Sequence, residues 1–323
     1  MTTLQTIRQT LATDLELLND VIRRQLSTSN PLMDKVVDNY LKTKGKLIRP
    51  IIVMLTARMF GGINERVLAA AASVELLHNA SLIHDDIVDQ SATRRGEPTI
   101  NAVWDNHIAV LVGDFFVSSS MQQAISTGDV RIIDALCHLG KLLSLGELDQ
   151  IYNARYHTLT EEAYYQIINY KTASLFVACA RMGCYASGVD DNRTEVLSRF
   201  AELLGMCFQI RDDIFDYFSG NENLGKPTGN DLREGKITLP LLHVLITEGD
   251  EKMLKLSQTE NLSDEDIATL VDFACSHGGI DYAYKRMDSM RTEAVNLLNT
   301  TFPDNEARHT LIQLFDYVIN RES

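Results

Sequence analysis

The distribution of proline constrains the fold of this chain more than any other feature. The sequence has only six prolines, and none of them lies between Pro98 and Pro227. Within that interval helix-forming residues predominate, and apolar residues recur every three or four positions. This recurrence is the period of a helix that buries one face. The sequence therefore predicts helices of roughly 12 to 25 residues with short connections, the anatomy of a large helical bundle.

The chain shows no sign of a division into separate domains. A chain of 323 residues can form one large domain or two ordinary ones. However, no low-complexity linker, repeat array or shift in composition marks a boundary. We therefore expect an all-α protein in which residues 1–323 form a single helical-bundle domain around a central cavity.

Charge and cysteine content restrict the partners and the compartment. The net charge of −14 argues against non-specific binding to nucleic acid or to an anionic membrane. The N-terminus has no secretory pattern, and no uninterrupted run of 18 apolar residues occurs, so we expect no stable membrane insertion. Five cysteines lie in apolar segments without metal-ligand spacing, which predicts buried, reduced thiols and a cytoplasmic protein: Cys137, Cys179, Cys184, Cys207 and Cys275.

An acidic pentapeptide occurs twice, as DDIVD at residues 85–89 and as DDIFD at residues 212–216. Carboxylates four residues apart share a helix face and repel each other, and a buried carboxylate needs a partner. Two such clusters flanked by apolar residues indicate that something strongly positive binds there. Divalent cations that bridge to phosphate, above all several Mg²⁺ ions, are the natural candidates.

Helical geometry places the residues of the first acidic motif. One stripe of the predicted helix carries His78, Leu82, Asp85 and Asp89. Asp86 lies about 100° around the helix and can support the site from the side. A solvated acidic turn is the alternative, and His78 alone could be a hydrogen-bonded core histidine. The apolar residues before the motif and the basic residues after it favour a metal site.

The second acidic motif follows the same logic. Gln209, either Asp212 or Asp213, and Asp216 form a stripe on the second predicted helix. By itself this segment could be an amphipathic surface helix. Paired with the first motif, it predicts a metal site with six candidate ligands in all: Asp85, Asp86, Asp89, Asp212, Asp213 and Asp216.

Basic residues beside glycine supply the complementary charge. They occur in three places, as Lys46 and Arg49, as Arg94 and Arg95, and as Lys226 and Lys236. Glycine allows the backbone to approach an anion, and arginine offers a fork that matches phosphate. Any one of these residues could be an ordinary surface charge, but two groups near the acidic motifs indicate two phosphate-bearing substrates. Lys171-Thr172 lies within an apolar helix and either contacts a buried anion or extends to the surface.

Taken together, these motifs closely resemble those of the trans-isoprenyl diphosphate synthases, the polyprenyl synthetase family, of the type that makes long-chain products. The resemblance runs from Gly45 to about Pro240 in ordered pieces: GKLIRP, ELLH, HDDIVD, RRG, KTA, FQIRDDIFDY and GKPTGNDLREGKITLP. One departure is that Lys44-Gly45 stands where the family often has two glycines.

The resemblance implies a reaction and a role for each site residue. Asp85, Asp89 and Asp212 would bind Mg²⁺ directly on the diphosphate of an allylic substrate, with the other three aspartates as close supports. The residues implied to contact the allylic diphosphate or its metal shell are Arg94, Lys171, Thr172, Gln209, Lys226 and Lys236. Those implied to hold isopentenyl diphosphate are Lys46, Arg49, His78 and Arg95. Family members are commonly homodimers.

Two small residues suggest the length of the product. Ala80 and Ser81 precede Asp85 by just over one turn, where large aromatic residues would block a hydrocarbon cavity. Because interiors are close-packed, small residues here leave room for a product of about thirty to fifty carbons. Phe115, Phe116 or Met121 could form the floor of that cavity or simply pack the core.

Three alternatives remain beside a long-chain synthase. A shorter-chain farnesyl or geranylgeranyl diphosphate synthase would use the same motifs. A terpene cyclase binds one diphosphate and does not need Lys46, Arg49 and Arg95. A non-catalytic partner subunit tends to lose aspartates or basic residues, whereas every expected one is present in this chain.

Overall fold

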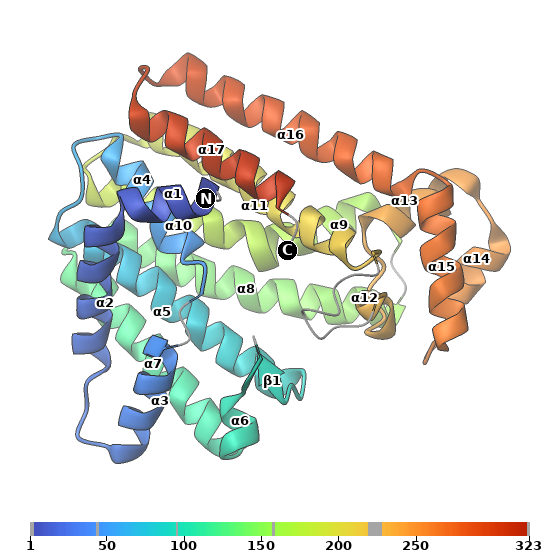
Figure 1. The fold of residues 1–323 in the computed structure, drawn as a ribbon, viewed down its shortest axis with the longest axis horizontal. Coiled ribbons are helices and arrows are strands. Elements are labelled where there is room, and N and C mark those ends of the chain that lie inside the picture. The colour runs from blue at the N-terminus through green and yellow to red at the C-terminus, as the bar shows by residue number, and fades with distance from the viewer. Residues whose placement is uncertain (1–2, 43–44, 95, 157–158, 219–227, 322–323) are drawn as a thin grey trace. The chain divides into compact units, whose positions relative to one another are not determined.

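The structure is a computed structural model, and it describes residues 3–42, 45–94, 96–156, 159–218 and 228–321. Helices account for nearly all of the regular structure in these residues (Figure 1). The exception is a two-stranded antiparallel ribbon, in which β1 (Thr93–Arg94) pairs with β2 (Glu97–Pro98). The predicted all-α class is therefore confirmed.

The chain divides into two compact units. Unit 1 comprises Met1–Gly140, Leu175–Ala201 and Leu298–Leu314. Unit 2 comprises Lys141–Ser174, Glu202–Leu297 and Phe315–Ser323. That residues 1–323 form one domain around a central cavity stays a prediction.

The helices belong to the units as follows. Unit 1 contains α1 (Thr3–Thr10), α2 (Ala12–Leu26), α3 (Pro31–Lys42), α4 (Ile48–Arg58), α5 (Glu65–Val88), α6 (Ile100–Val103) and α7 (Asn106–Ser126). Unit 2 contains α9 (Glu161–Ile168), the π-helical segment η1 (Asn169–Ala173), α12 (Asn230–Arg233), α13 (Leu239–Glu248), α14 (Glu251–Ser257) and α15 (Asp264–Ser276). Helices with residues in both units are α8 (Val130–Tyr156), α10 (Ser174–Ala186), α11 (Asp191–Phe215), α16 (Gly279–Thr301) and α17 (Glu306–Asn320).

The core of unit 1 is the packing of α5 against α7. The Asn64 side chain accepts a hydrogen bond from the backbone N–H of Val67 (3.0 Å), which caps the start of α5. A run of small buried residues, Ala69–Ala72, follows and permits close approach of the neighbouring helices. The Ser120 hydroxyl donates to the carbonyl of Ser73 (2.8 Å) and joins the two helices. This packing fixes the direction in which α5 delivers the first acidic motif.

The core of unit 2 includes the packing of α13 against α15. Leu241 and Val244 of α13 are buried in one apolar cluster with Leu270 of α15. The start of α15 carries a capping box, in which Ser263 and Asp266 satisfy each other's backbone N–H groups. The apolar cluster supports the segment that leads into α13, where several predicted site residues lie.

In the part of the chain that the structure describes, two helices are long and apolar enough to cross a membrane when judged by length and composition alone. They are α5 and α7. Buried helices of globular proteins meet the same criterion, and 67% of the apolar window of α5 lies inside the protein. For α7 the buried share is 39%, because Val110, Leu111, Met121 and Ile125 are exposed.

The cysteines are all free, but they are not all buried. Cys179, Cys184 and Cys207 are buried, as the sequence predicts. Cys137 and Cys275 are exposed, so the expectation of five buried thiols is wrong for these two. Each lies on the outer side of an amphipathic helix, where an apolar neighbourhood in the sequence does not ensure burial.

Candidate functional site

The first acidic motif forms the end of α5. Asp85 is half-buried and Asp89 is exposed, and the backbone N–H of Asp89 donates to the carbonyl of Asp85 (2.8 Å). Residues four apart on a helix share a face, so the two carboxylates are adjacent ligand candidates. Asp86, which lies between them in the sequence, is buried and only 6% exposed.

Asp86 has a different partner from the one that the sequence suggests. The Arg94 guanidinium binds its Oδ1 atom through Nε (2.8 Å) and Nη2 (2.7 Å). The β1–β2 ribbon places Arg94 for this contact. The sequence pairs Asp86 with metal and Arg94 with a diphosphate, whereas in this structure the two side chains pair with each other.

A cavity of about 150 Å³ lies beside the first motif in unit 1. Its polar lining includes Tyr40, Glu75, Asn79, Asp86 and Arg94. The cavity also borders Gly45 and Leu47, which flank the predicted substrate residue Lys46. Lys46 itself is exposed, Arg49 is half-buried and His78 is buried.

The predicted chain-length residues also lie in unit 1. Ala80 is fully buried, and the Ser81 hydroxyl donates to the carbonyl of His78 (2.9 Å). Phe116 is fully buried and packs edge-on against Tyr40. Phe115 is half-buried, whereas Met121 lies at the surface with 47% exposure.

The second acidic motif ends α11 in unit 2, and Asp213 is its buried member. The Gln209 amide donates to Oδ1 of Asp213 (2.8 Å), and the Tyr164 hydroxyl donates to Oδ2 (2.6 Å). The Thr172 hydroxyl in turn donates to the Gln209 amide oxygen (2.7 Å). Burial raises the pKa of Asp213 to about 8, and the charge of Asp231 adds to this effect. The carboxyl is therefore held by a connected polar network rather than by solvent.

The other two aspartates of this motif also have defined partners. Asp216 accepts the backbone N–H of Asn230 on Oδ1 (3.0 Å) and that of Asp231 on Oδ2 (2.9 Å). It therefore fixes the start of α12. Asp212 is half-buried, and Arg321 binds its Oδ1 atom (2.5 Å).

Lys171 and Thr172 lie on the π-helical segment η1. The Lys171 ammonium contacts the Glu147 carboxylate (2.5 Å) and the Gln150 amide oxygen (3.1 Å), both on α8. A Cβ atom added at Gly146 would lie 2.8 Å from the backbone nitrogen of Lys171, so α8 approaches η1 closely at this glycine. π-Helical turns inside helices are frequent at functional sites because they redirect side chains.

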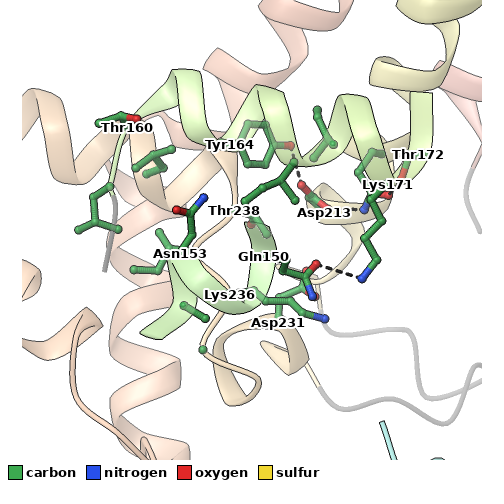
Figure 2. A pocket seen from close by; sticks show the side chains of 18 residues that line it. Gln150, Asn153, Thr160, Tyr164, Lys171, Thr172, Asp213, Asp231, Lys236 and Thr238 are labelled. Carbon is green, nitrogen blue, oxygen red and sulfur yellow. Dashed lines mark hydrogen bonds between the residues drawn. The ribbon is translucent and has the colours of Figure 1, made fainter. Parts of the chain in front are cut away.

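One cavity of about 240 Å³ joins these residues of unit 2. Figure 2 shows Tyr164 and Asp213 pointing toward each other, with Lys171 directed toward Gln150. The site residues along its wall are Lys171, Thr172, Gln209, Asp213, Asp231 and Lys236. The structure thus brings together four of the predicted substrate residues.

Lys236 is half-buried and pairs with Glu234 (2.5 Å). The predicted site residues Arg95 and Lys226 lie outside the described residues.

The acidic motifs can provide oxygen ligands to a divalent cation. Among the residues that the structure describes, no group of three or more His, Cys, Asp or Glu side chains could hold a metal ion. Mg²⁺ commonly keeps several waters and uses only one or two carboxylates together with substrate phosphates. The adjacent pair Asp85 and Asp89 provides such a partial set of oxygen ligands.

Three residues of the site were not identified from the sequence. Tyr164 could have been suspected, because it lies two helical turns before Lys171. Glu147 follows the glycine at which α8 meets η1, but nothing in the sequence reveals that approach. Arg321 lies far beyond the motifs, and only the folded chain brings it to Asp212.

This helical fold, with its two acidic motifs and nearby basic side chains, is shared with a class of prenyltransferase enzymes. The family model described as polyprenyl synthetase matches residues 30–273. Octaprenyl diphosphate synthase from Escherichia coli is 33% identical over 86% of this chain and 86% of that protein. Component 2 of heptaprenyl diphosphate synthase from Bacillus subtilis is 34% identical over 86% of this chain and 79% of its own length. Geranylgeranyl diphosphate synthase from Sulfolobus acidocaldarius is 32% identical over 87% of this chain and 88% of that protein.

Solved structures agree with this assignment. A decaprenyl diphosphate synthase from Rhodobacter capsulatus has a TM-score of 0.91, with 32% identity over 98% of this chain and 99% of its own. A polyprenyl synthase from Caulobacter crescentus, complexed with calcium and isoprenyl diphosphate, has a TM-score of 0.90, with 28% identity over 99% of this chain and 98% of its own. The chain belongs to the polyprenyl synthetase family. It is a prenyltransferase with trans-prenyl diphosphate synthase activity, as the resemblance predicts.

Proposed function

We propose that this enzyme condenses isopentenyl diphosphate with an allylic prenyl diphosphate. We further propose that it elongates the product to about thirty to fifty carbons, because small residues leave room for the product in an otherwise close-packed interior. The observation that carries the proposal is the cavity of unit 2. Lys171, Gln209 and Lys236 line this cavity together with the buried Asp213. The family resemblance assigns the same residues to an allylic diphosphate.

The proposed cofactor is Mg²⁺, with more than one ion per site. Asp85, Asp89 and Asp212 are the proposed direct ligands, and Asp86, Asp213 and Asp216 are supports. When bound, the ions neutralise charge on the diphosphate as it leaves. The partly exposed Asp85, Asp89 and Asp212 suit direct ligation, whereas the buried Asp213 is held by its neighbours.

The proposed substrate residues act through charge and hydrogen bonds. Lys171 and Lys236 stabilise the negative charge on the allylic diphosphate, and Gln209 donates from its amide. Glu147 and Gln150 hold the Lys171 ammonium in place before substrate binds. The other proposed contacts are Thr172, Arg94 and Lys226 for the allylic substrate, and Lys46, Arg49, His78 and Arg95 for isopentenyl diphosphate.

The proposed reaction breaks the allylic carbon–oxygen bond, forms a carbon–carbon bond and ends with the transfer of a proton. The allylic carbon–oxygen bond ionises, and its electron pair leaves with the diphosphate. The double bond of isopentenyl diphosphate then supplies the electrons for the new carbon–carbon bond. Loss of a proton to the released diphosphate restores a double bond. Exclusion of water by apolar side chains protects the allylic cation from hydrolysis.

The long-chain product is supported by the small residues on α5. Ala80 and Ser81 place no bulky side chain just before Asp85. Phe116 lies deeper between α5 and α7 and is the favoured candidate for part of the floor. We expect Ser81→Phe to shorten the product, whereas Ser81→Thr keeps the hydroxyl and should leave the chain length near that of the wild type. Unchanged chain length in Ser81→Phe would contradict the cavity argument.

A product analysis tests the whole proposal. The purified chain is incubated with isopentenyl diphosphate and Mg²⁺, together with a geranyl, farnesyl or geranylgeranyl diphosphate primer. Mass spectrometry should show linear prenyl diphosphates of about thirty to fifty carbons, the length that the cavity argument predicts. Products of fifteen or twenty carbons would indicate a short-chain synthase, and a cyclised hydrocarbon without elongation would indicate a terpene cyclase.

The same experiment tests whether the chain acts alone. One relative is a component 2 of its enzyme, which raises the alternative of a partner subunit. We propose instead an active homodimer that uses the apolar surface of α7, where Leu111 is 67% and Ile125 is 60% exposed. Leu111→Glu should shift the mass measured by light scattering from dimer to monomer. Inactivity of the purified wild-type chain would favour the heteromeric alternative.

We also propose that the protein acts in the cytoplasm. All five cysteines are free, which suits a reducing compartment. Fractionation of cells that express the native chain should place it with the cytoplasmic proteins. Recovery in a secreted fraction would contradict the proposal.

A further inference from the structure

The last residue that the structure describes, Arg321, is buried against the second acidic motif. Only 5% of its side chain is exposed. Its Nη2 atom donates to Oδ1 of Asp212 (2.5 Å) and to the backbone carbonyl of Phe208 (3.0 Å). The guanidinium also stacks over the Phe208 ring, with its central carbon 4.0 Å from the ring centroid. The C-terminal end of α17 therefore delivers a fixed cation to one acidic residue of the site.

Arg321 is itself held by a second buried arginine. Arg211 donates to the carbonyl of Arg321 from Nε (3.0 Å) and from Nη2 (2.6 Å). Its third contact is with the Tyr284 hydroxyl on α16 (2.5 Å). The Arg211 guanidinium stacks over the Phe215 ring at 4.5 Å. Several independent contacts would have to break before Arg321 could move, so Arg321 is firmly held in this structure.

This arrangement affects the orientation of the Asp212 carboxylate. The guanidinium bond to Oδ1 restricts rotation of the carboxylate, so that the group keeps one orientation. Groups that orient a metal ligand in this manner commonly change metal affinity by about 10- to 100-fold when they are removed.

We propose that Arg321 is a positioning residue that orients Asp212 for a divalent cation. The inference rests on the proposed function, in which Asp212 is a direct ligand of Mg²⁺. Arg321 would touch neither the substrate nor the metal. It would act through its hydrogen bond to Oδ1 of Asp212. Arg211 would hold Arg321 in place through the hydrogen bonds to the Arg321 carbonyl.

The experiment measures Mg²⁺ binding by isothermal titration calorimetry in the presence of saturating inorganic diphosphate. Arg321→Gln removes the charge, and we expect Mg²⁺ affinity to fall about tenfold. Arg321→Lys keeps a charge at the same position, and its affinity should remain between that of Arg321→Gln and that of the wild type. The Mg²⁺ concentration for half-maximal activity should follow the same order.

A matched control comes from a buried arginine within α17. Arg308 donates to the carbonyl of Phe302 (2.9 Å) and binds Asp304 (2.6 Å), away from the acidic motifs. Arg308→Gln therefore removes an equivalent set of contacts without touching Asp212. We expect it to lower the melting temperature while Mg²⁺ affinity stays at the wild-type value.

The outcomes separate this inference from the proposed function. If Asp212→Asn leaves Mg²⁺ binding unchanged, the assignment of Asp212 as a ligand fails. If Asp212→Asn weakens binding but Arg321→Gln does not, only the positioning role is overturned. Tighter binding in Arg321→Gln would also overturn it, because Arg321 would then compete with the metal.

A second variant covers the case in which Arg321→Gln does not fold. Arg211→Lys leaves Arg321 in the chain but removes the pair of hydrogen bonds that the Arg211 guanidinium donates to the Arg321 carbonyl. We expect this variant to weaken Mg²⁺ binding in the same direction and by a smaller factor. A folded Arg211→Lys protein with wild-type Mg²⁺ affinity would then overturn the proposal.

Discussion

The Tyr164 hydroxyl donates a hydrogen bond to Oδ2 of Asp213 across 2.6 Å, and both side chains are buried. The Gln209 amide occupies the other oxygen of the same carboxyl. Because a buried polar group is costly without partners, this pair stabilises unit 2 as well as shaping its cavity. Tyr164 is therefore a structural support of the second acidic motif.

Removal of the Tyr164 hydroxyl should weaken both stability and activity. Tyr164→Phe keeps the ring but leaves Oδ2 of Asp213 without this donor. We expect the free energy of unfolding to fall by about 1–3 kcal/mol, the usual cost of losing a partner for a buried polar group. Chemical denaturation measures the change. Synthase activity should also fall, since the Asp213 carboxyl lines the same cavity as Lys171.

The neighbouring tyrosine provides the control for this prediction. Tyr165 accepts a hydrogen bond from Arg286 (3.0 Å) on α16 rather than contacting Asp213. Tyr165→Phe should therefore lower stability by a comparable amount and leave the kinetics near those of the wild type. Equal loss of activity in both variants would show that Tyr164 has no special relation to the site.

The approach of α8 to η1 makes a second prediction. Gly146→Ala would place a methyl group 2.8 Å from the Lys171 backbone nitrogen, a distance that forces the backbone to shift. Lys171 and Thr172 would move with η1, so we expect a large loss of activity and a raised KM for the allylic substrate. Steady-state kinetics with varied primer concentration measures both effects.

A second glycine of the same helix is the matched control. An added Cβ at Gly140 meets nothing within 4 Å. Alanine is the better helix former by about 1 kcal/mol, so Gly140→Ala should stabilise the chain and retain activity. If Gly146→Ala behaves like Gly140→Ala, the close packing of α8 on η1 has no functional consequence.

The helical class could be predicted from the sequence, because it depends on local patterns of residue type and spacing. Helical spacing also separates Asp86 from Asp85 and Asp89, and Asp86 is the buried one of the three. Lys171, Gln209 and Lys236 lie on three different segments, and only the family resemblance implied that they share a ligand. In the structure these three residues line one cavity.

Contacts that depend on the three-dimensional path of the chain could not be predicted in this way. Arg94 and Asp86 are close in sequence, yet their pairing depends on the path of the β1–β2 ribbon. The contact of Arg321 with Asp212 depends on where α17 ends. Exposure of Cys137 and Cys275 likewise depends on which helix faces are covered by other elements. No periodicity within a segment encodes these contacts.

The cysteines provide a third prediction, concerning reactivity. Burial raises the pKa of Cys184 and of Cys207 to about 12, and it also raises the pKa of Cys179. At pH 8 these three thiols should carry very little thiolate and should be shielded from reagents. We expect a chromogenic disulfide reagent to modify the exposed Cys137 rapidly in the native protein. Cys275 is also exposed and should react, but more slowly, because partial burial raises the pKa of its thiol.

Unfolding supplies the comparison for the thiol measurement. All five cysteines should react in denaturant, because unfolding removes the burial that raises the pKa values. Mass spectrometry of the native, modified protein should then locate the label on two residues. Rapid native labelling of any of the three buried cysteines would contradict their placement in the core.

The last prediction concerns the ion pair between Asp86 and Arg94. Its measurement distinguishes two possible roles of Asp86. As a partner of Arg94, Asp86 stabilises the metal-free protein, whereas as a metal support it matters only when ions are bound. We expect Asp86→Asn and Arg94→Gln to lower the free energy of unfolding without metal, and their effects to be non-additive by about 1 kcal/mol. Urea denaturation of the two single variants and the double variant in the presence of a chelator measures this coupling. Additive effects in the chelator, together with a weakened Mg²⁺ affinity of Asp86→Asn, would instead favour a metal role for this carboxylate.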